Sequence, residues 1–295
     1  MILTVDIYGL AVGGRSIGTI VDGPPDSIGK KAMIWGAAPG ERVRCSIEKD
    51  HGRYVLAKIE EIETLSPARI EPKCSHFSVC GGCDLQYLEV ETQREEKLKL
   101  ISGTIERHLK VSPTDGYTDL SGRLPDYGYR NRITLHLDRN GNLGFYKRGS
   151  RHVADITNCP ISSEVINKAI TKLREIAPQL VALQCANCIL EQRDEMVLVK
   201  FTTIGGKAIQ PNSKLRRTLE NFSMTPAEIF ENQEADSIRP VGHFSQVNDV
   251  GNEVLIKTIT QLISNRRVIE LYAGAGNFSF RLLENGIEHI TAVEI

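Results

Sequence analysis

The sequence predicts a multidomain protein of mixed α/β and β structure. It has a small N-terminal OB-like β-barrel, a central α+β domain and the start of a doubly wound α/β sheet. Three observations predict this. Short apolar strands between glycine and proline breaks fill the N-terminal part, closely spaced cysteines follow, and the C-terminal part has a strand, glycine loop, helix and strand in succession.

The N-terminal strands are short and separated by turn residues, which favours a small antiparallel barrel. The expected strands are Leu3–Ile7, Ser16–Val21, Arg42–Glu48 and Tyr54–Ile62. Some barrels of this kind bind oligonucleotides and many do not. Residues 1–62 hold eight basic and eight acidic residues, so their charge gives no support for nucleic-acid binding.

The composition is that of an ordinary globular protein, with a net charge of −1 and seven cysteines. Residues Met1–Arg15 lack the basic and apolar regions of a signal peptide, and no apolar run is long enough for a membrane span. We therefore expect a cytoplasmic protein. Thiols stay reduced in that compartment, so a close group of cysteines indicates a metal site or catalysis before disulfides.

Cys74, Cys80 and Cys83 have the spacing C-x5-C-x2-C, with Gly81 and Gly82 inside the close pair. The glycines would let the backbone fold tightly around a metal centre. Cys159, followed by a proline, is the best candidate for a fourth ligand, because iron–sulfur cubanes and structural zinc both favour four cysteines. The spacing leaves both metals open.

The remaining cysteines carry weaker signals. Cys185 and Cys188 also have C-x2-C spacing but no partner pair, which favours core cysteines or a weak metal site. Cys45, alone in a strand, is expected in the core. Further elements follow from periodicity: helices at Tyr87–Lys110, Ser163–Ala177 (closed by Pro178) and Asp249–Ser264, and a hairpin from Ile189–Gln192 and Met196–Phe201.

Residues 123–151 carry seven basic residues against two acidic ones, a net of +5, with four tyrosine and phenylalanine residues between them. Strands at Ile133–Leu137 and Leu143–Tyr146 flank Asn140-Gly141, a strong hairpin signal. Basic side chains beside aromatic ones on a sheet suit phosphate contact and base stacking. An ordinary solvated hairpin is the alternative.

The segment from Val268 to Glu294 has the pattern of a nucleotide-binding crevice. A buried strand, Val268–Leu271, leads into Gly274 and Gly276, and a helix over Phe278–Glu284 and a strand over Ile290–Val293 follow, ending in Glu294. Glycines permit close approach of a ligand, and the terminal acid suits ribose hydroxyls. Ser279 replaces the third glycine of the dinucleotide fingerprint, which disfavours NAD. The pattern suits the E-x-x-x-G-x-G form of S-adenosylmethionine (SAM) enzymes, beginning at Glu270.

Together these segments resemble the bacterial RNA 5-methyluridine methyltransferases that carry an N-terminal TRAM domain and an iron–sulfur cluster. The resemblance rests on the cysteine set with Cys159-Pro160, Y-R-N-R (Tyr129–Arg132), L-G-F-Y-x-R-G (Leu143–Gly149), F-x-Q-V-N (Phe244–Asn248) and the loop Tyr272–Phe278. These motifs span nearly the whole chain in the order of the family.

The resemblance implies a TRAM-like barrel at residues 1–63, a central cluster and RNA-binding domain at 64–90 and 117–237, and an incomplete SAM-dependent methyltransferase domain at 91–116 and 238–295. It implies a [4Fe-4S] cluster held by Cys74, Cys80, Cys83 and Cys159. Expected SAM-binding residues are Gln246, Tyr272, Gly274, Gly276, Asn277 and Glu294. Expected RNA-binding residues are Arg130, Arg132, Phe145 and Arg148. The implied substrate is RNA, ribosomal in preference to transfer RNA, with no membrane and no obligate protein partner.

In this family a cysteine thiolate adds to uracil C6, the methyl group is transferred to C5, and a carboxylate base removes the C5 proton. The family nucleophile lies well after the glycine loop, whereas Cys185 and Cys188 precede it. We therefore expect the nucleophile and the base to lie beyond Ile295, this chain to be inactive alone, and its sheet to expose apolar surface.

Two other classes of function stay open. The chain could be a non-catalytic RNA-binding protein with a structural four-cysteine metal site, although the SAM features argue against that reading. It could also be a SAM enzyme acting on a small molecule with a zinc-stabilised domain, which the basic and aromatic stretch disfavours.

Overall fold

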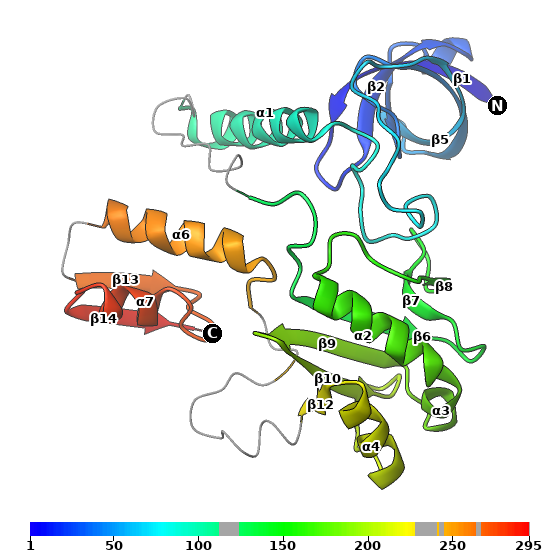
Figure 1. Cartoon of the computed structure of the whole chain (residues 1–295). Helices are drawn as coiled ribbons and strands as arrows, with labels where there is room; N and C mark the ends of the chain where they lie inside the picture. The colour runs from blue at the N-terminus through cyan, green and yellow to red at the C-terminus, as the bar shows by residue number, and fades with distance from the viewer. Residues whose placement is uncertain (112–123, 228–240, 242–244, 264–266, 295) are drawn as a thin grey trace. The chain divides into compact units, whose positions relative to one another are not determined.

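The computed structural model describes residues 1–111, 124–227, 241, 245–263 and 267–294 (Figure 1). The chain forms two compact units, Met1–Ser121 and Gly122–Ile295, which are described separately below. Among the described residues, every helix is too short or too polar to span a bilayer.

The first unit begins with a closed five-stranded barrel in the order β1-β2-β3-β5-β4. Its strands are β1 (Ile2–Leu10), β2 (Ser16–Asp22), β3 (Lys31–Ile34), β4 (Arg42–Asp50) and β5 (Tyr54–Thr64), with a 3-10 turn at Pro25–Ser27. Alternate apolar side chains of these strands, including Leu3, Val5, Ile20 and Val43, fill the interior. The expected barrel is thus present, with Cys45 in its core.

The sequence reading missed β3. This strand is only four residues long, and it pairs with β5 in parallel, whereas β1 pairs antiparallel with both β2 and β4. Gly18 on β2 explains how β1 and β2 approach so closely, because a Cβ there would lie 2.6 Å from the Asp6 carbonyl oxygen.

The cysteine segment follows the barrel and leads into α1 (Val90–Leu109). The predicted helix is present, but its apolar residues do not mark its buried side. Ile101 and Leu109 are exposed, whereas Glu96 is buried and accepts a hydrogen bond from the Leu10 amide at 3.2 Å. The apolar spacing therefore identified the helix but not the side that contacts the barrel.

The second unit is built on a sheet with strand order β11-β10-β9-β6-β7-β8, with β12 added beside β10. Its strands are β6 (Arg132–Leu137), β7 (Leu143–Tyr146), β8 (Val153–Asp155), β9 (Asn187–Arg193), β10 (Met196–Thr202), β11 (Ala208–Ile209) and β12 (Met224–Pro226). The β6–β7 and β9–β10 hairpins lie where the sequence predicts them.

Three helices pack on one face of this sheet: α2 (Glu164–Glu175), α3 (Ala177–Ala182) and α4 (Ser213–Asn221). Ser163 caps α2 by accepting the Ile166 amide. The expectation that Pro178 closes the preceding helix is only partly correct. The chain bends at Ile176 and continues as α3 with Pro178 in its first turn, where its missing N–H costs nothing.

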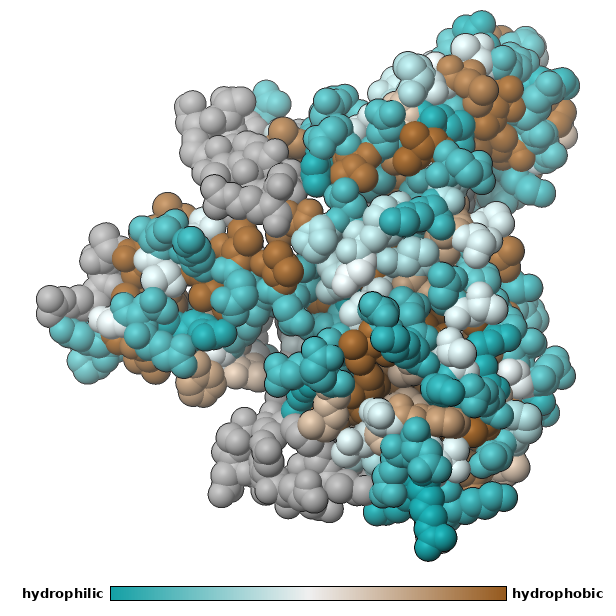
Figure 2. Space-filling view, in the orientation of Figure 1, coloured by the Kyte–Doolittle hydropathy of each residue, from teal (hydrophilic) through white to brown (hydrophobic). Residues whose placement is uncertain are grey.

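The last part of the chain consists of α6 (Asp249–Leu262), β13 (Arg267–Leu271), α7 (Ser279–Glu284) and β14 (His289–Val293), and the two strands are parallel. The expectation that Val268–Leu271 is a buried strand is wrong, since Ile269 is 70% and Leu271 64% exposed. Among the described residues β13 has one partner strand, so its outward side chains lack cover. Apolar side chains accordingly show on the surface of this region (Figure 2).

Candidate functional site

The glycine loop after β13 turns sharply through left-handed backbone conformations. Tyr272, Gly274 and Gly276 have φ angles of 58°, 56° and 77°. Glycine adopts such angles freely, but a tyrosine does so at a cost, and strain of this kind concentrates at functional sites. The Tyr272 side chain is highly exposed. The strained turn thus leaves this ring available at the entrance of the loop.

Glu294 lies beside this loop. The Gly274 amide donates to its Oε2 at 2.6 Å. The contact arises because β13 and β14 are parallel neighbours, so their carboxyl ends lie at the same edge. The structure thus brings together the glycine loop and the terminal acid that the sequence singled out.

Glu270 and Ser279 explain the departure from the dinucleotide fingerprint. The Ser279 hydroxyl donates to the Glu270 carboxylate, joining the first residue of α7 to β13. A glycine at position 279 could not make this bond. In the dinucleotide fingerprint the third glycine allows the helix to pack closely on the strand. Here a hydrogen bond from Ser279 to Glu270 joins α7 to β13 instead.

Asn277 is held by a residue that the sequence reading did not single out. Its amide and that of Asn252 on α6 exchange two hydrogen bonds, of 2.8 and 2.9 Å. Both ends of the Asn277 side chain are thereby oriented by α6.

Gln246 lies in a segment that joins α6 to the central sheet. This segment, Ser245–Asn248, precedes α6 and runs beside Tyr129–Arg132: the Asn131 amide donates to the Val247 carbonyl at 2.9 Å, and Arg130 forms a bridge with Asn248. The Asn131 side chain also donates to Asp249 at 2.6 Å. Two motifs more than a hundred residues apart in sequence therefore meet. Phe244 lies outside the described residues.

The predicted RNA-binding residues have different environments. Arg132 donates to the Ser245 hydroxyl at 3.1 Å, and the Arg130 Nε donates to the Arg132 carbonyl at 3.0 Å. Phe145 packs against the core of the second unit. Arg148 lies in the turn after β7.

The predicted cluster ligands are divided between the two units, with Cys74, Cys80 and Cys83 in the first and Cys159 in the second. The first three are partly exposed thiols. The Gly82 amide donates to the Cys80 sulfur at 3.4 Å, a type of contact that tunes iron–sulfur sites. The loop at Cys159 is fixed by Asn167, which accepts the Cys159 amide at 2.7 Å. In the part of the chain that the structure describes, no three His, Cys, Asp or Glu side chains are gathered as metal ligands.

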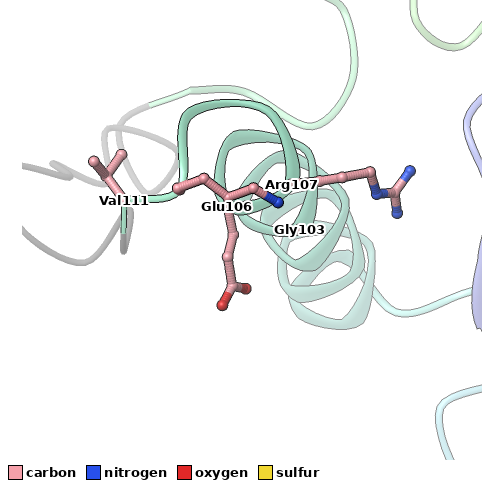
Figure 3. A pocket seen from close by; sticks show the side chains of 5 residues that line it. Gly103, Glu106, Arg107 and Val111 are labelled. Carbon is pink, nitrogen blue, oxygen red and sulfur yellow. The ribbon is translucent and has the colours of Figure 1, made fainter.

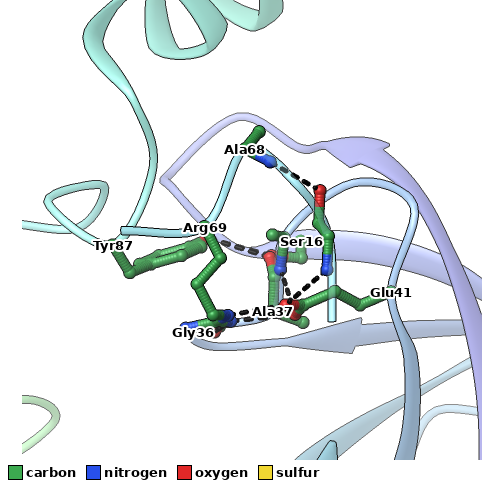
Figure 4. A network of polar contacts seen from close by, with 9 residues as sticks. Ser16, Gly36, Ala37, Glu41, Ala68, Arg69 and Tyr87 are labelled. Carbon is green, nitrogen blue, oxygen red and sulfur yellow. Dashed lines mark hydrogen bonds and ion pairs between the residues drawn. The ribbon is translucent and has the colours of Figure 1, made fainter. Parts of the chain in front are cut away.

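A buried ion pair anchors the cysteine segment to the barrel (Figure 4). Glu41, whose side chain is fully buried, accepts Arg69 Nε at 2.6 Å and Nη2 at 2.8 Å, together with the Ala38 amide at 2.7 Å. This contact raises the pKa of Arg69. The Arg69 guanidinium also lies over the Tyr87 ring, and the Tyr87 hydroxyl donates to the Ala37 carbonyl at 3.0 Å.

The other three cysteines are in hydrophobic cores. Burial raises the pKa of Cys45 to about 12. The Cys185 and Cys188 sulfurs are 3.8 Å apart, and this contact lowers the pKa of Cys185 and, with burial, raises that of Cys188. These environments favour core cysteines over a second metal site.

A hollow of about 570 Å³ at the C-terminal end of α1 is separate from these residues (Figure 3). Gly103, Glu106, Arg107, Lys110 and Val111 line it. None of the predicted site residues contributes to it.

Sequence reasoning missed Asn131, Asn252 and the Glu41–Arg69 pair. The partners of Asn131 and Asn252 are distant in sequence, so periodicity gives no sign of them. An acid and a base 28 residues apart likewise look like ordinary surface charges. Asn131 does lie within the Tyr129–Arg132 motif, and this position was the one sequence feature that could have indicated its role.

The fold is similar to that of one RNA uracil-C5 methyltransferase of known structure. The Pyrococcus abyssi tRNA (uracil-54, C5)-methyltransferase, solved in complex with S-adenosyl-L-homocysteine, superposes with a TM-score of 0.64 over 96% of this chain and 71% of that one, at 17% identity. A scan against models of known protein families finds no match.

Comparison with relatives of known sequence is more specific than the structural comparison. The 23S rRNA (uracil(1939)-C(5))-methyltransferase RlmD of Shewanella piezotolerans is 27% identical over 89% of this chain and 65% of its own length. The enzymes of the same name from Halomonas elongata and Cupriavidus metallidurans are both 28% identical, over 98% and 96% of this chain. This chain is a distant homologue of the RlmD-type 23S rRNA uracil-C5 methyltransferases, and this similarity agrees with the family resemblance of its motifs. It spans about 65% of the length of these relatives.

Proposed function

We propose that this chain is the RNA-recognition and cofactor-binding part of an enzyme that uses SAM to methylate uracil C5 in RNA, with ribosomal RNA as the substrate. The observation that carries the proposal is the hydrogen bond between the Gly274 amide and Glu294 at the ends of two parallel strands. The names of the relatives supply the reaction class.

The loop residues fit a SAM molecule. Gly274 and Gly276 have no side chain to hinder its approach, and Tyr272 offers an exposed ring. Glu294 uses Oε2 for the loop amide, and a carboxylate has acceptor capacity left on Oε1 for a ribose hydroxyl. Asn277 is oriented by Asn252, and we add Gln246 to the contact set from the family motif.

SAM, when bound, supplies an electrophilic methyl group. Uracil C5 becomes nucleophilic after a cysteine thiolate adds to C6, and a carboxylate later removes the C5 proton so that elimination frees the thiolate. No cysteine follows Gly276 in these 295 residues, and we assign none of them as the nucleophile or the base. The target base must also leave its stack, at a cost of a few kcal/mol.

We further propose that Cys74, Cys80, Cys83 and Cys159 hold a [4Fe-4S] cluster with a structural or RNA-positioning role. Four thiols and an amide donating to a sulfur suit such a cluster. The cluster is not part of a radical-SAM centre, because that class uses C-x3-C-x2-C spacing and the first interval here is five residues.

Two equilibrium measurements test the proposed function. Calorimetry should detect SAM binding that Glu294→Ala weakens about tenfold, the loss of a charge-assisted hydrogen bond. Glu284→Ala, on the exposed end of α7, should leave the SAM affinity unchanged.

RNA affinity should fall steeply between about 50 and 200 mM salt. RNA binding without SAM binding would instead support a binding protein. SAM binding without salt-sensitive RNA binding would support a small-molecule enzyme.

The cluster has its own test. Protein purified without oxygen should be brown and contain about four irons and four sulfides per chain. Cys159→Ser should lose them, whereas Cys45→Ala, which removes a buried barrel thiol, should retain them. A colourless protein with stoichiometric zinc would rule out the iron–sulfur assignment.

A further inference from the structure

His136 on β6 and Tyr146 on β7 form a stacked aromatic pair. Their ring centroids are 3.7 Å apart and their planes differ by 10°. The register of the hairpin explains the contact. His136 lies opposite Gly144, which has no side chain, so the Tyr146 ring, two residues further on, can extend over the glycine to His136.

The histidine is held from its other side by a hydrogen-bonded row across the sheet. The Asn187 side chain donates to the Thr202 hydroxyl at 3.0 Å, which directs its carbonyl oxygen toward His136 Nδ1, 2.8 Å away. With that amide orientation, Nδ1 carries the proton and donates. The ring is thereby fixed rather than free to rotate.

This pair lies on the face of the sheet opposite the main core. Ile133, Leu135 and Leu137 of β6 point into that core with the helices, so the alternating residue His136 points the other way. Phe145 likewise faces the core, whereas Tyr146 is 39% exposed. One face of the tyrosine ring covers the histidine, and the residue keeps 39% of its surface exposed.

The surroundings of Tyr146 are positively charged. From Arg139 to Ala154 the sequence has four Lys and Arg residues and no Asp or Glu. Lys147 begins a tight turn in which its amide donates to the His152 carbonyl and its carbonyl accepts the Ser150 amide. This turn presents Lys147 and Arg151, both exposed, directly after the aromatic pair.

We propose that the stacked His136–Tyr146 pair is a platform on which a base of single-stranded RNA stacks, while the Lys147–His152 turn contacts the adjoining phosphates. A preformed aromatic surface beside basic side chains is the combination that single-stranded nucleic acid requires. The inference rests on the proposed RNA function and gives it a specific contact. It assigns to Tyr146 the stacking role that Phe145 is too enclosed to perform.

Fluorescence anisotropy with a fluorescein-labelled single-stranded RNA of about twelve nucleotides tests this, together with the same RNA carrying abasic positions. Tyr146→Leu should bind the complete RNA about tenfold more weakly, and Tyr146→Phe nearly as well as the unchanged protein. Met196→Ala is the matched control, because Met196 is also 39% exposed and lies on β10 of the same sheet. Thermal unfolding of each variant reports whether the fold is intact.

The abasic RNA separates base stacking from phosphate contact. If stacking contributes, the unchanged protein should bind the abasic RNA about tenfold more weakly, and Tyr146→Leu should bind both RNAs alike. RNA binding that is insensitive to both changes would overturn the platform while leaving the proposed function in place. A protein that binds no RNA would overturn both, whatever its affinity for SAM.

Discussion

Replacing Arg69 with methionine is expected to lower the free energy of unfolding of the first unit by about 3 kcal/mol or more. The substitution leaves the Glu41 carboxylate fully buried without its cationic partner. Removing one member of a buried pair costs far more than the pair contributes, because the remaining charge keeps its desolvation penalty. The Ala38 and Ser66 amides, which also donate to Glu41, offset only part of that penalty.

Chemical denaturation followed by Trp35 fluorescence measures this effect. Trp35 is the only tryptophan and adjoins Gly36, whose carbonyl accepts Arg69 Nη2 at 2.6 Å. The control is Arg42→Met, which removes the exposed ion pair with Asp6 and should lower the free energy of unfolding far less, because solvent screens that pair. Equal effects of the two substitutions would contradict the assignment of a buried pair.

A double variant, Glu41→Leu with Arg69→Met, separates the charge from the hydrogen bonds. It removes the uncompensated carboxylate and should recover part of the lost stability. Full recovery is not expected, since the Ala38 and Ser66 amides would lose their acceptor.

Gly276→Ala is expected to reduce SAM affinity at least about tenfold, because the glycine permits close approach of the ligand to the backbone. Gly276 has a φ of 77°, and a Cβ there would lie 2.6 Å from the Phe280 ring. The ring would have to move from its place beside the loop, and the backbone would be strained as well. Isothermal calorimetry with SAM or S-adenosylhomocysteine measures the loss.

Gly286→Ala is the matched control for backbone strain. Gly286 has a φ of 91°, but a Cβ there would contact nothing within 4 Å. Both variants should lose about 1 kcal/mol of stability from the left-handed conformation. If Gly286→Ala weakened SAM binding equally, the effect would come from general destabilisation and not from the loop.

Local signals predicted much of the fold. The hairpin at Asn140-Gly141 has the expected strands to within one residue, because the short turn between Leu137 and Leu143, with Gly141 at a φ of 85°, fixes the register. The glycine loop and Glu294 were also found from sequence, since strand, loop and acid are close in the chain. The four strands recognised in the barrel likewise carried clear breaks between them.

What sequence could not supply was pairing between distant segments. Nothing in Lys31–Ile34 indicates that it joins β5 in parallel, because four residues are too few for the alternation of buried and exposed side chains to identify a strand. Glu96 lies in the helix predicted at Tyr87–Lys110, but nothing near it in sequence indicates that it accepts the Leu10 amide. Tyr146 and His136 both lie in the predicted basic, aromatic hairpin, but their stacking depends on Gly144 lying opposite His136.

The strand order of the barrel has a consequence for its synthesis. β1, β2 and β3 are neighbours in sequence and in the sheet, so they can pair as soon as they are made. Closure requires β4 beside β1 and β5 beside β3, so it must wait until the chain has grown to Thr64. Until then the edges of β1 and β3 are open and the inward side chains uncovered. A translational pause before Thr64 would therefore hold the nascent chain in its most aggregation-prone form.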